Sequence, residues 1–233
     1  MCWARWHDIK VVLRYWEMIL TLAEWQTTYK DPADLIVQAS SIRCDDGWQS
    51  FPIGMSWQYV LNHKLGPALQ FGGHEKLFLC ALSAGTDRQR RPVGINRRAI
   101  IDTLDGNGIK NRLIDHHEYF TTLPSYKFVM SPEGNGIDCH RHYEALLAGC
   151  IPVMERNPLT EEKYRDCPIL YTTDYSEITP AYLEQKYKTM IDKEYNFARL
   201  FLSYYDDHIQ EDIKDSGNFW LKRIQDTNCT WYT

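Results

Sequence analysis

Residues 128–154 limit what this chain can fold into more than any other stretch, because they predict a strand, a glycine loop, a helix and a second strand in immediate succession. The run 127–130 is short, apolar and β-prone, and Ser131-Pro132 ends it. The run 150–154 has the same apolar character and predicts the next buried strand. Buried strands that alternate with helices are typical of a parallel sheet covered on both faces.

The segment between these two strands is suited to binding an anion. Its loop contains residues that permit a sharp turn and a close approach of backbone N–H groups to a ligand: Gly134, Asn135 and Gly136. Asp138 is a suitable N-cap for a helix over residues 139–148, and Gly149 is suited to end that helix. Unpaired N–H groups and the helix dipole both favour negative charge at this position, so we expect an anion site here.

Arg141 and Glu144 are three positions apart, so they share one face of the expected helix just inside its N-terminus. The planar fork of donors on Arg141 is suited to a pyrophosphate, and Glu144 is placed to accept hydrogen bonds from the hydroxyls of a ribose. The alternative interpretation is an ordinary ion pair on an exposed helix face, because such pairs are common and weak.

Three short runs follow one another in this stretch: SPEG at 131–134, HRHYEAL at 140–146 and AGCIPV at 148–153. Their order and spacing resemble the nucleotide-sugar motif of exostosin-like glycosyltransferases. The resemblance implies a two-lobed, Rossmann-type (GT-B-like) α/β fold, whose parallel sheet has helices on both faces and whose second lobe binds the donor. In that family the arginine faces the diphosphate and the glutamate faces the ribose, which implies these roles for Arg141 and Glu144.

The same resemblance, together with a small-residue loop and an arginine cluster after an earlier strand, implies a larger donor site. Its expected members are Ser83, Gly85, Arg97, Arg98, Ser131, Pro132, Glu133, Gly134, Asn135, Gly136, Asp138, His140, Arg141 and Glu144. The loop also carries Arg88, Arg90 and Arg91, and we expect at least one arginine of the cluster to contact phosphate. A solvated loop is the alternative for this cluster.

Fucosyltransferase-like enzymes share the strand–loop–helix but have E-K where this chain has Arg141 and Glu144, which favours a uridine over a guanosine nucleotide. The chain also resembles the compact glycosyltransferases encoded by large DNA viruses of algae. That resemblance suggests a pentose donor such as UDP-xylose and a location in the host cytoplasm. The implied partners are a nucleotide sugar and a glycan acceptor.

The charge and composition of the chain exclude other classes of protein. A formal net charge of -5 and a pI near 5.9 disfavour a nucleic-acid binder, because phosphate backbones require a basic face. The apolar run 18–23 is flanked by Glu17 and Glu24, so no membrane span is expected. The 7 cysteines are odd in number and scattered, which favours a reducing, cytoplasmic compartment.

The remaining elements predict a reduced N-terminal lobe at residues 1–70 and a donor-binding lobe with C-terminal helices at 71–233. Residues 3–23 fit a helical stripe, although 8–13 also fit a strand. Further elements are expected as strands at 35–37, 77–82, 109–114 and 169–172 and as helices at 56–64, 95–104, 116–125 (helix or loop), 180–192 and 196–225. Thr179 is the expected cap of the helix that begins at Pro180.

The mechanism implied by the resemblance is an inverting, metal-independent displacement at the anomeric carbon, with a base from the first lobe. The candidates for this base are Asp45, Asp46, His63 and His74. No metal site is expected, because Cys139 and His142 lack further ligands at a suitable spacing and Asp45-Asp46 lacks D-x-D spacing. A nucleotide-sugar-binding module without transferase activity, or another phosphate-handling Rossmann enzyme such as a phosphatase or dehydrogenase, remains as an alternative. The dehydrogenase is disfavoured because no G-x-G-x-x-G follows an early strand.

Overall fold

The computed structural model describes residues 2–6, 9–14, 35–38, 49–50, 74–88, 90–134, 136–200, 202–208 and 210. The chain divides into two compact units, residues 1–53 with 198–233, and residues 54–197. The expected lobe boundary near residue 70 and the expected helix at 56–64 lie outside the described residues, so both stay predictions.

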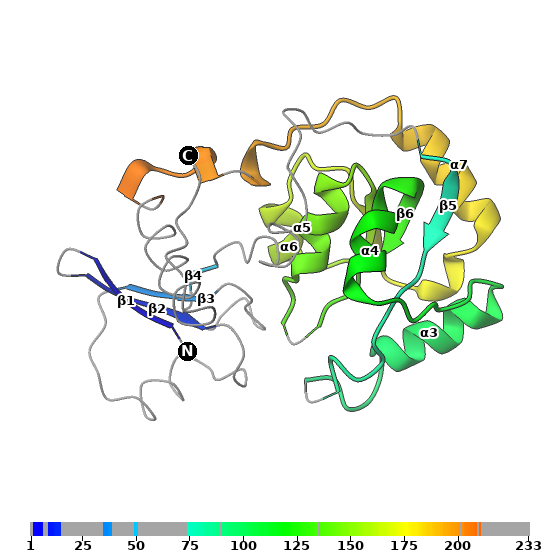
Figure 1. Ribbon diagram of the computed structural model, residues 1–233, viewed down its shortest axis with the longest axis horizontal. Coiled ribbons are helices and arrows are strands. Elements are labelled where there is room, and N and C mark those ends of the chain that lie inside the picture. Colours follow the sequence, from blue (N-terminus) through cyan, green and yellow to red (C-terminus); the bar gives the residue numbers. More distant parts are fainter. Residues whose placement is uncertain are drawn as a thin grey trace. The chain divides into compact units, whose positions relative to one another are not determined.

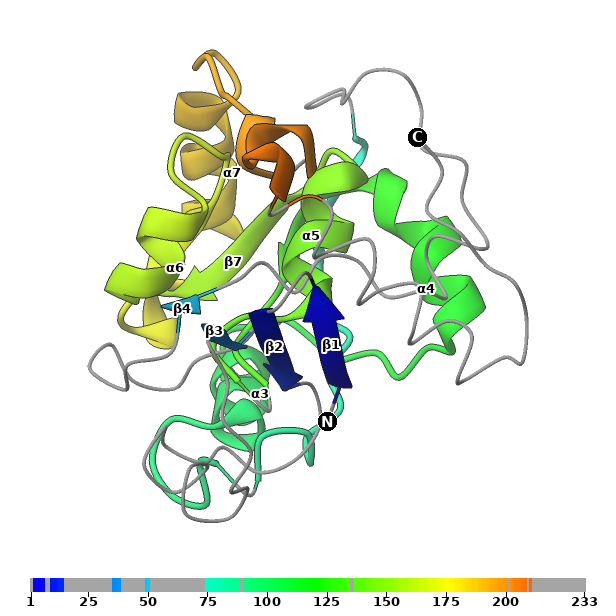
Figure 2. The ribbon, with the colours of Figure 1, turned by 90° about the vertical axis from the view of Figure 1, so that its left-hand side faces the viewer.

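The first unit contains a four-stranded mixed sheet in the order β1-β2-β3-β4 (Figure 2). Its strands are β1 (Cys2–Trp6), β2 (Ile9–Arg14), β3 (Leu35–Gln38) and β4 (Gln49–Ser50). β1 and β2 are antiparallel, whereas the β2–β3 and β3–β4 pairs are parallel. Of the two alternatives for this segment, the strand at 8–13 is therefore confirmed. The helix over 3–23 is wrong for the described residues of that range, which form β1 and β2. Short 3-10 helices at Ala198–Leu200 and Leu202–Tyr204 stand where a longer helix was expected, whereas the described residues 207, 208 and 210 are α-helical; the rest of the expected helix at 196–225 lies outside the described residues.

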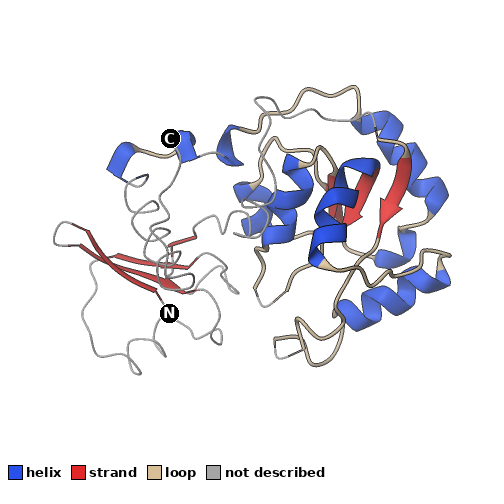
Figure 3. Cartoon of the chain, in the orientation of Figure 1, coloured by secondary structure: helices blue, strands red, loops and turns tan. Residues whose placement is uncertain are grey.

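The second unit contains a four-stranded, wholly parallel sheet in the order β5-β6-β7-β8, in which strands alternate with helices (Figure 3). Its strands are β5 (Lys76–Leu79), β6 (Tyr126–Met130), β7 (Ile151–Glu155) and β8 (Leu170–Thr172). Phe128 of β6 is in register with Phe78 of β5 and Ile151 of β7. The expectation of a parallel α/β sheet is confirmed for this unit.

The strand expected at 109–114 is wrong, because this segment is irregular. Asn111 explains the difference: its side chain accepts from the N–H of Leu82 at 2.7 Å and donates to the carbonyl of Leu82 at 3.0 Å. One backbone hydrogen bond connects this segment to the chain just after β5: the N–H of Arg112 donates to the carbonyl of Cys80. A side-chain amide thus satisfies backbone groups that a strand would otherwise pair.

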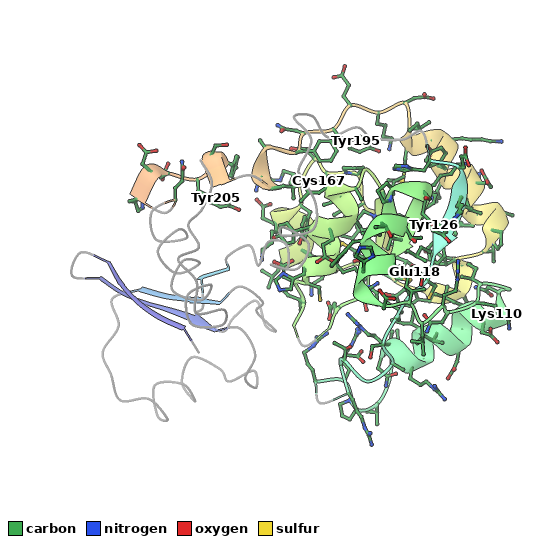
Figure 4. The ribbon with its side chains drawn as sticks, in the orientation of Figure 1. Lys110, Glu118, Tyr126, Cys167, Tyr195 and Tyr205 are labelled. Carbon is green, nitrogen blue, oxygen red and sulfur yellow. The ribbon has the colours of Figure 1, made fainter. Side chains whose placement is uncertain are left out.

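The helices of the second unit are α3 (Arg97–Gly106), α4 (His116–Thr122), α5 (His140–Leu147), α6 (Pro158–Lys163) and α7 (Pro180–Met190), with 3-10 helices at Leu123–Ser125 and Tyr175–Glu177. Thr179 caps α7 as expected, its side chain accepting from the N–H of Tyr182. Helix α6 was not expected, although Asn157 caps it and Pro158 opens it. Figure 4 marks Tyr126 at the start of β6 and Glu118 on α4.

Helices cover both faces of this sheet, as expected (Figure 1). On one face, Phe128 and Ile151 pack with Ile100 of α3 and Leu183 of α7. The opposite face carries a second cluster: Leu79, Ala81, Tyr119, Phe120, Leu123, Tyr126, Val129, Ala145 and Cys150. Each large apolar side chain buried in this way contributes about 1.5–3 kcal/mol of transfer free energy. No helix of the described residues has the length and apolar character needed to cross a membrane.

Candidate functional site

The loops that follow β5 and β6 meet at the carboxyl edge of the parallel sheet. Arg90 Nε donates to the carbonyl of Gly134 at 3.0 Å, and Arg97 Nε donates to the carbonyl of Glu133 at 2.9 Å. This edge is where open α/β sheets bind ligands. The expectation that the two loops lie side by side is therefore confirmed.

Two arginines of the first loop are held by carboxylates. Arg90 Nη2 lies 2.6 Å from Glu133 Oε2, while Arg91 lies 2.8 Å from Asp87 Oδ2 and 2.7 Å from Glu155 Oε1. Glu155 also accepts from the N–H of Glu133 at 2.9 Å. These charge-assisted bonds fasten the arginine loop to the end of β6 and β7. The guanidinium groups of Arg90 and Arg91 thus have a structural role that the sequence interpretation did not anticipate.

Arg97 lies beneath the β6 loop, with only 5% of its surface exposed. Besides its bond to Glu133, its Nη2 donates to the carbonyl of Pro132 at 3.2 Å. Among the described residues it forms no ion pair with a carboxylate, and its backbone N–H donates to Asp87 Oδ2 at 2.9 Å. Burial, and to a lesser extent the charge of Arg141, lower the pKa of Arg97.

Arg98, the neighbouring candidate, has a side chain that is 71% exposed and 3.6 Å from Asp102 on the same helix. The structure therefore places Arg98 on the exposed face of α3 and does not bring it to the β6 loop as it brings Arg97. Ser83 and Gly85 occupy the loop after β5, where both are exposed. An added Cβ on Gly85 would meet nothing within 4 Å, so a close approach to other parts of the protein does not require this glycine.

Ser131 lies at the carboxyl end of β6 but its hydroxyl is fully buried. It donates to His142 Nδ1 at 2.8 Å, while His142 Nε2 donates to the carbonyl of Ile137 at 3.3 Å. Burial lowers the pKa of His142 to about 4, so the ring is neutral and both bonds are compatible with one tautomer. This pair joins β6 to α5, and Ser131, expected in the donor site, is 0% exposed with its hydroxyl bonded to His142.

Asp138 is not the N-cap of α5, which corrects the sequence interpretation. The N-cap is Cys139, whose side chain makes no capping hydrogen bond. Asp138 is buried and accepts from Lys163 Nζ at 2.8 Å, from Tyr143 Oη at 3.2 Å and from Tyr164 Oη. Despite burial, the charge of Lys163 and these bonds lower the pKa of Asp138. Asp138 therefore anchors the loop to α6, and the N-cap position of α5 supplies no side-chain cap.

The glycine turn before α5 is tightly packed. The N–H of Gly134 donates to the carbonyl of Gly136 at 2.9 Å. A Cβ on Gly134 would lie 3.0 Å from Arg97 Nη2 and 3.1 Å from Cys139 Sγ, so a side chain here would force these neighbours to shift. Pro132 is buried at the start of the turn, and His140 is half-buried at the first position of α5. Asn135 lies outside the described residues.

Arg141 is the guanidinium of the site that remains without a full set of partners. Its Cζ lies 4.7 Å from the centre of the Tyr119 ring, and its buried Nη1 has no hydrogen-bond partner in the part of the chain that the structure describes. Among the described residues it forms no ion pair with a carboxylate. Glu144 is 5% exposed, so the alternative of an exposed Arg141–Glu144 surface pair is wrong. The expectation that α5 ends at Gly149 is confirmed, since its φ is 78°.

His74 is placed at the far end of α5 from Arg141. Its Nε2 lies 2.9 Å from the carbonyl of Gly149, just beyond the C-terminus of the helix. An eight-residue helix is about 12 Å long, so His74 does not share the carboxyl-edge site. Asp45, Asp46 and His63 lie outside the described residues, so their assignment as candidate bases stays a prediction.

Sequence reasoning missed Tyr119, Asp87 and Glu155 as parts of this edge. Tyr119 gave no signal beyond an aromatic side chain in an apolar segment, and Glu155 acts through Arg91, 64 positions away. Asp87 pairs with Arg91 only four positions away, a spacing that the sequence does contain. Within the described residues, no group of three or more His, Cys, Asp or Glu side chains is placed to hold a metal ion. Comparison of the sequence with protein-family models and with curated protein sequences gives no significant match.

Proposed function

We propose that the carboxyl edge of the β5–β8 sheet binds the diphosphate of a nucleotide sugar and that the protein is a glycosyltransferase. One observation carries this proposal: among the described residues, the buried Arg141 Nη1 has no hydrogen-bond partner, and the N-cap Cys139 of the same helix makes no capping hydrogen bond. A buried donor without a partner costs about 1–3 kcal/mol, more if it is charged. An anion bound at this position removes that cost and also meets the positive end of the helix dipole.

The charge distribution around the loop supports this assignment. Arg90 and Arg91 are neutralised by Asp87, Glu133 and Glu155. Among the described residues the side chain of Arg97 donates to carbonyl oxygens and to no carboxylate, so its positive charge adds to that of Arg141. The charge of Arg141 also contributes to lowering the pKa of Arg97, because two positive charges near one another repel. A diphosphate near both groups would relieve this repulsion.

The reaction we propose is a direct displacement. A base takes the proton of an acceptor hydroxyl, the acceptor oxygen bonds to the anomeric carbon, and the bond from that carbon to the diphosphate oxygen breaks with inversion. Arg141 and the first turn of α5 stabilise the negative charge that develops on the leaving diphosphate. We expect this to make a divalent metal unnecessary. Asp45, Asp46 and His63 remain the candidate bases.

We propose a UDP-sugar as the donor, with UDP-xylose as the first candidate, and a glycan hydroxyl as the acceptor. Glu144 is assigned to the ribose hydroxyls by the same resemblance that assigns Arg141 to the diphosphate. The free cysteines among the described residues, Cys80, Cys139, Cys150 and Cys167, agree with a cytoplasmic location, which forms part of the proposal.

A thermal-shift panel tests the proposal, because a ligand that binds only the native state raises the melting temperature. The panel contains UDP, GDP, ADP, NAD and several nucleotide sugars, with EDTA and again with Mn²⁺. We expect stabilisation by UDP and a UDP-sugar in EDTA, followed by UDP release when a glycan acceptor is added. Stabilisation by GDP alone would favour a fucosyltransferase-like enzyme, and binding without UDP release would favour a binding module. No stabilisation by any nucleotide would refute the proposal.

A further inference from the structure

Tyr119 provides the surface on which the guanidinium of Arg141 lies. Tyr119 belongs to α4, which Glu118 marks in Figure 4, whereas Arg141 belongs to α5. The distance from Arg141 Cζ to the ring centre is 4.7 Å, within the range of a cation–π contact. The ring is 5% exposed and packed into the core cluster beneath α4 and α5, so it cannot turn away from this position freely.

The contact with the Tyr119 ring fixes the guanidinium of Arg141 without neutralising its positive charge. A carboxylate at the same place would fix the guanidinium but cancel its positive charge, as Glu133 does for Arg90. The Tyr119 hydroxyl stays protonated, because burial raises its pKa, so it supplies no negative charge of its own. The face of the ring therefore attracts the guanidinium through the ring quadrupole alone.

We propose that Tyr119 is a positioning residue for Arg141, which it holds ready for the diphosphate while leaving the positive charge available. This inference rests on the proposed function and adds α4 to the donor site. Tyr119 Oη is buried and, like Arg141 Nη1, has no hydrogen-bond partner among the described residues. The hydroxyl is thus dispensable for the contact, and the ring is the part that acts.

The test compares variants of Tyr119 in two backgrounds by isothermal titration calorimetry. Tyr119→Leu removes the ring, Tyr119→Phe keeps it and removes only the hydroxyl, and Phe120→Leu removes a neighbouring buried ring from the same core cluster. Each is combined with native Arg141 and with Arg141→Gln. UDP is the probe, and uridine, which lacks phosphate, reports on the rest of the nucleotide site.

We expect Tyr119→Leu to weaken UDP binding by about fivefold to tenfold, the range of a partly buried cation–π contact, and to leave uridine binding unchanged. Tyr119→Phe should bind UDP within about twofold of wild type and melt at a higher temperature, because an unpaired buried hydroxyl is removed. In the Arg141→Gln background, Tyr119→Leu should have no further effect on UDP. Phe120→Leu should lower the melting temperature without changing the ratio of UDP to uridine affinity.

An equal loss of UDP affinity from Tyr119→Leu in both backgrounds would show that the ring acts through the core and would overturn the proposal. Tyr119→Phe behaving like Tyr119→Leu would also overturn it, since the hydroxyl would then be the active part. UDP binding that depends on Arg141 but not on Tyr119 would refute only this inference. Absence of UDP binding to the wild-type protein would refute the proposed function as well.

Discussion

Lowering the pH should destabilise this protein through one buried residue, His142. The imidazole is fully buried and bonded to Ser131 Oγ and to the carbonyl of Ile137. Burial lowers its pKa from 6.5 to about 4. Because the folded pKa is the lower one, the unfolded chain takes up the proton first. The stabilising contribution of the neutral His142 is therefore fully present above about pH 7 and is lost as the pH drops towards 4. Below that pH the free energy of unfolding changes little through this group.

The size of the effect follows from these two pKa values. Each unit of difference is worth about 1.4 kcal/mol, so the full effect of a shift from 6.5 to about 4 is roughly 3 kcal/mol. Between about pH 7.5 and about pH 4.5 the loss should be about 2.5 kcal/mol, obtained by linkage. A loss of that size corresponds to a fall in melting temperature of about 5–10 °C for a domain of this size.

Urea unfolding followed by fluorescence at several pH values measures this loss. His142→Gln keeps a side-chain donor but cannot titrate. Between about pH 7.5 and about pH 4.5, its free energy of unfolding should therefore fall by about 2.5 kcal/mol less than that of wild type. His117→Gln, the same exchange at an exposed position on α4, controls for the substitution itself. Parallel pH profiles for wild type and His142→Gln would refute the assignment of a neutral, buried imidazole.

Two further predictions concern the packing behind the site. Asp138→Asn should lower the free energy of unfolding by about 3 kcal/mol at neutral pH, because it removes the carboxylate charge that faces the buried Lys163 ammonium. Lys163→Met should recover part of that loss in the double variant, and additive losses in urea unfolding would contradict a coupled pair. Gly134→Ala should lower the free energy of unfolding by about 1–3 kcal/mol, because its Cβ would press on Arg97 Nη2. Gly85→Ala, the control, should change it by less than about 0.5 kcal/mol. Equal melting temperatures for these two variants would contradict tight packing at Gly134.

The fold of the second unit was predictable where local signals suffice. Apolar runs located β6 and β7, and Gly149 and Thr179 marked a helix end and a helix start correctly. These signals act over a few residues, because capping and chain reversal depend on neighbours in sequence. The strand predicted at 109–114 is wrong, because an apolar pattern does not reveal that the Asn111 side chain bonds to the backbone groups that a strand would pair.

The individual site residues were less predictable, because their partners are distant in sequence. His74 bonds to a carbonyl 75 positions away, and the side chain of Arg97 bonds to carbonyls 35 and 36 positions away. Asp138 is paired with Lys163, 25 positions away, instead of capping the helix next to it. Residue type suggested ligand contacts for Arg97 and Asp138. Only the tertiary structure reveals that their polar groups already have protein partners.

The most direct test of the account is calorimetric titration of UDP into wild type, Arg141→Ala and Arg98→Ala in EDTA. Both variants lose one positive charge, but Arg98 lies on the exposed face of α3 beside Asp102. We expect Arg141→Ala to lower UDP affinity by about tenfold to a hundredfold, the value of a charge-assisted hydrogen bond, and Arg98→Ala to change it by less than about twofold. Equal affinities in the two variants, or no UDP binding by wild type, would contradict a diphosphate site at the N-terminus of α5.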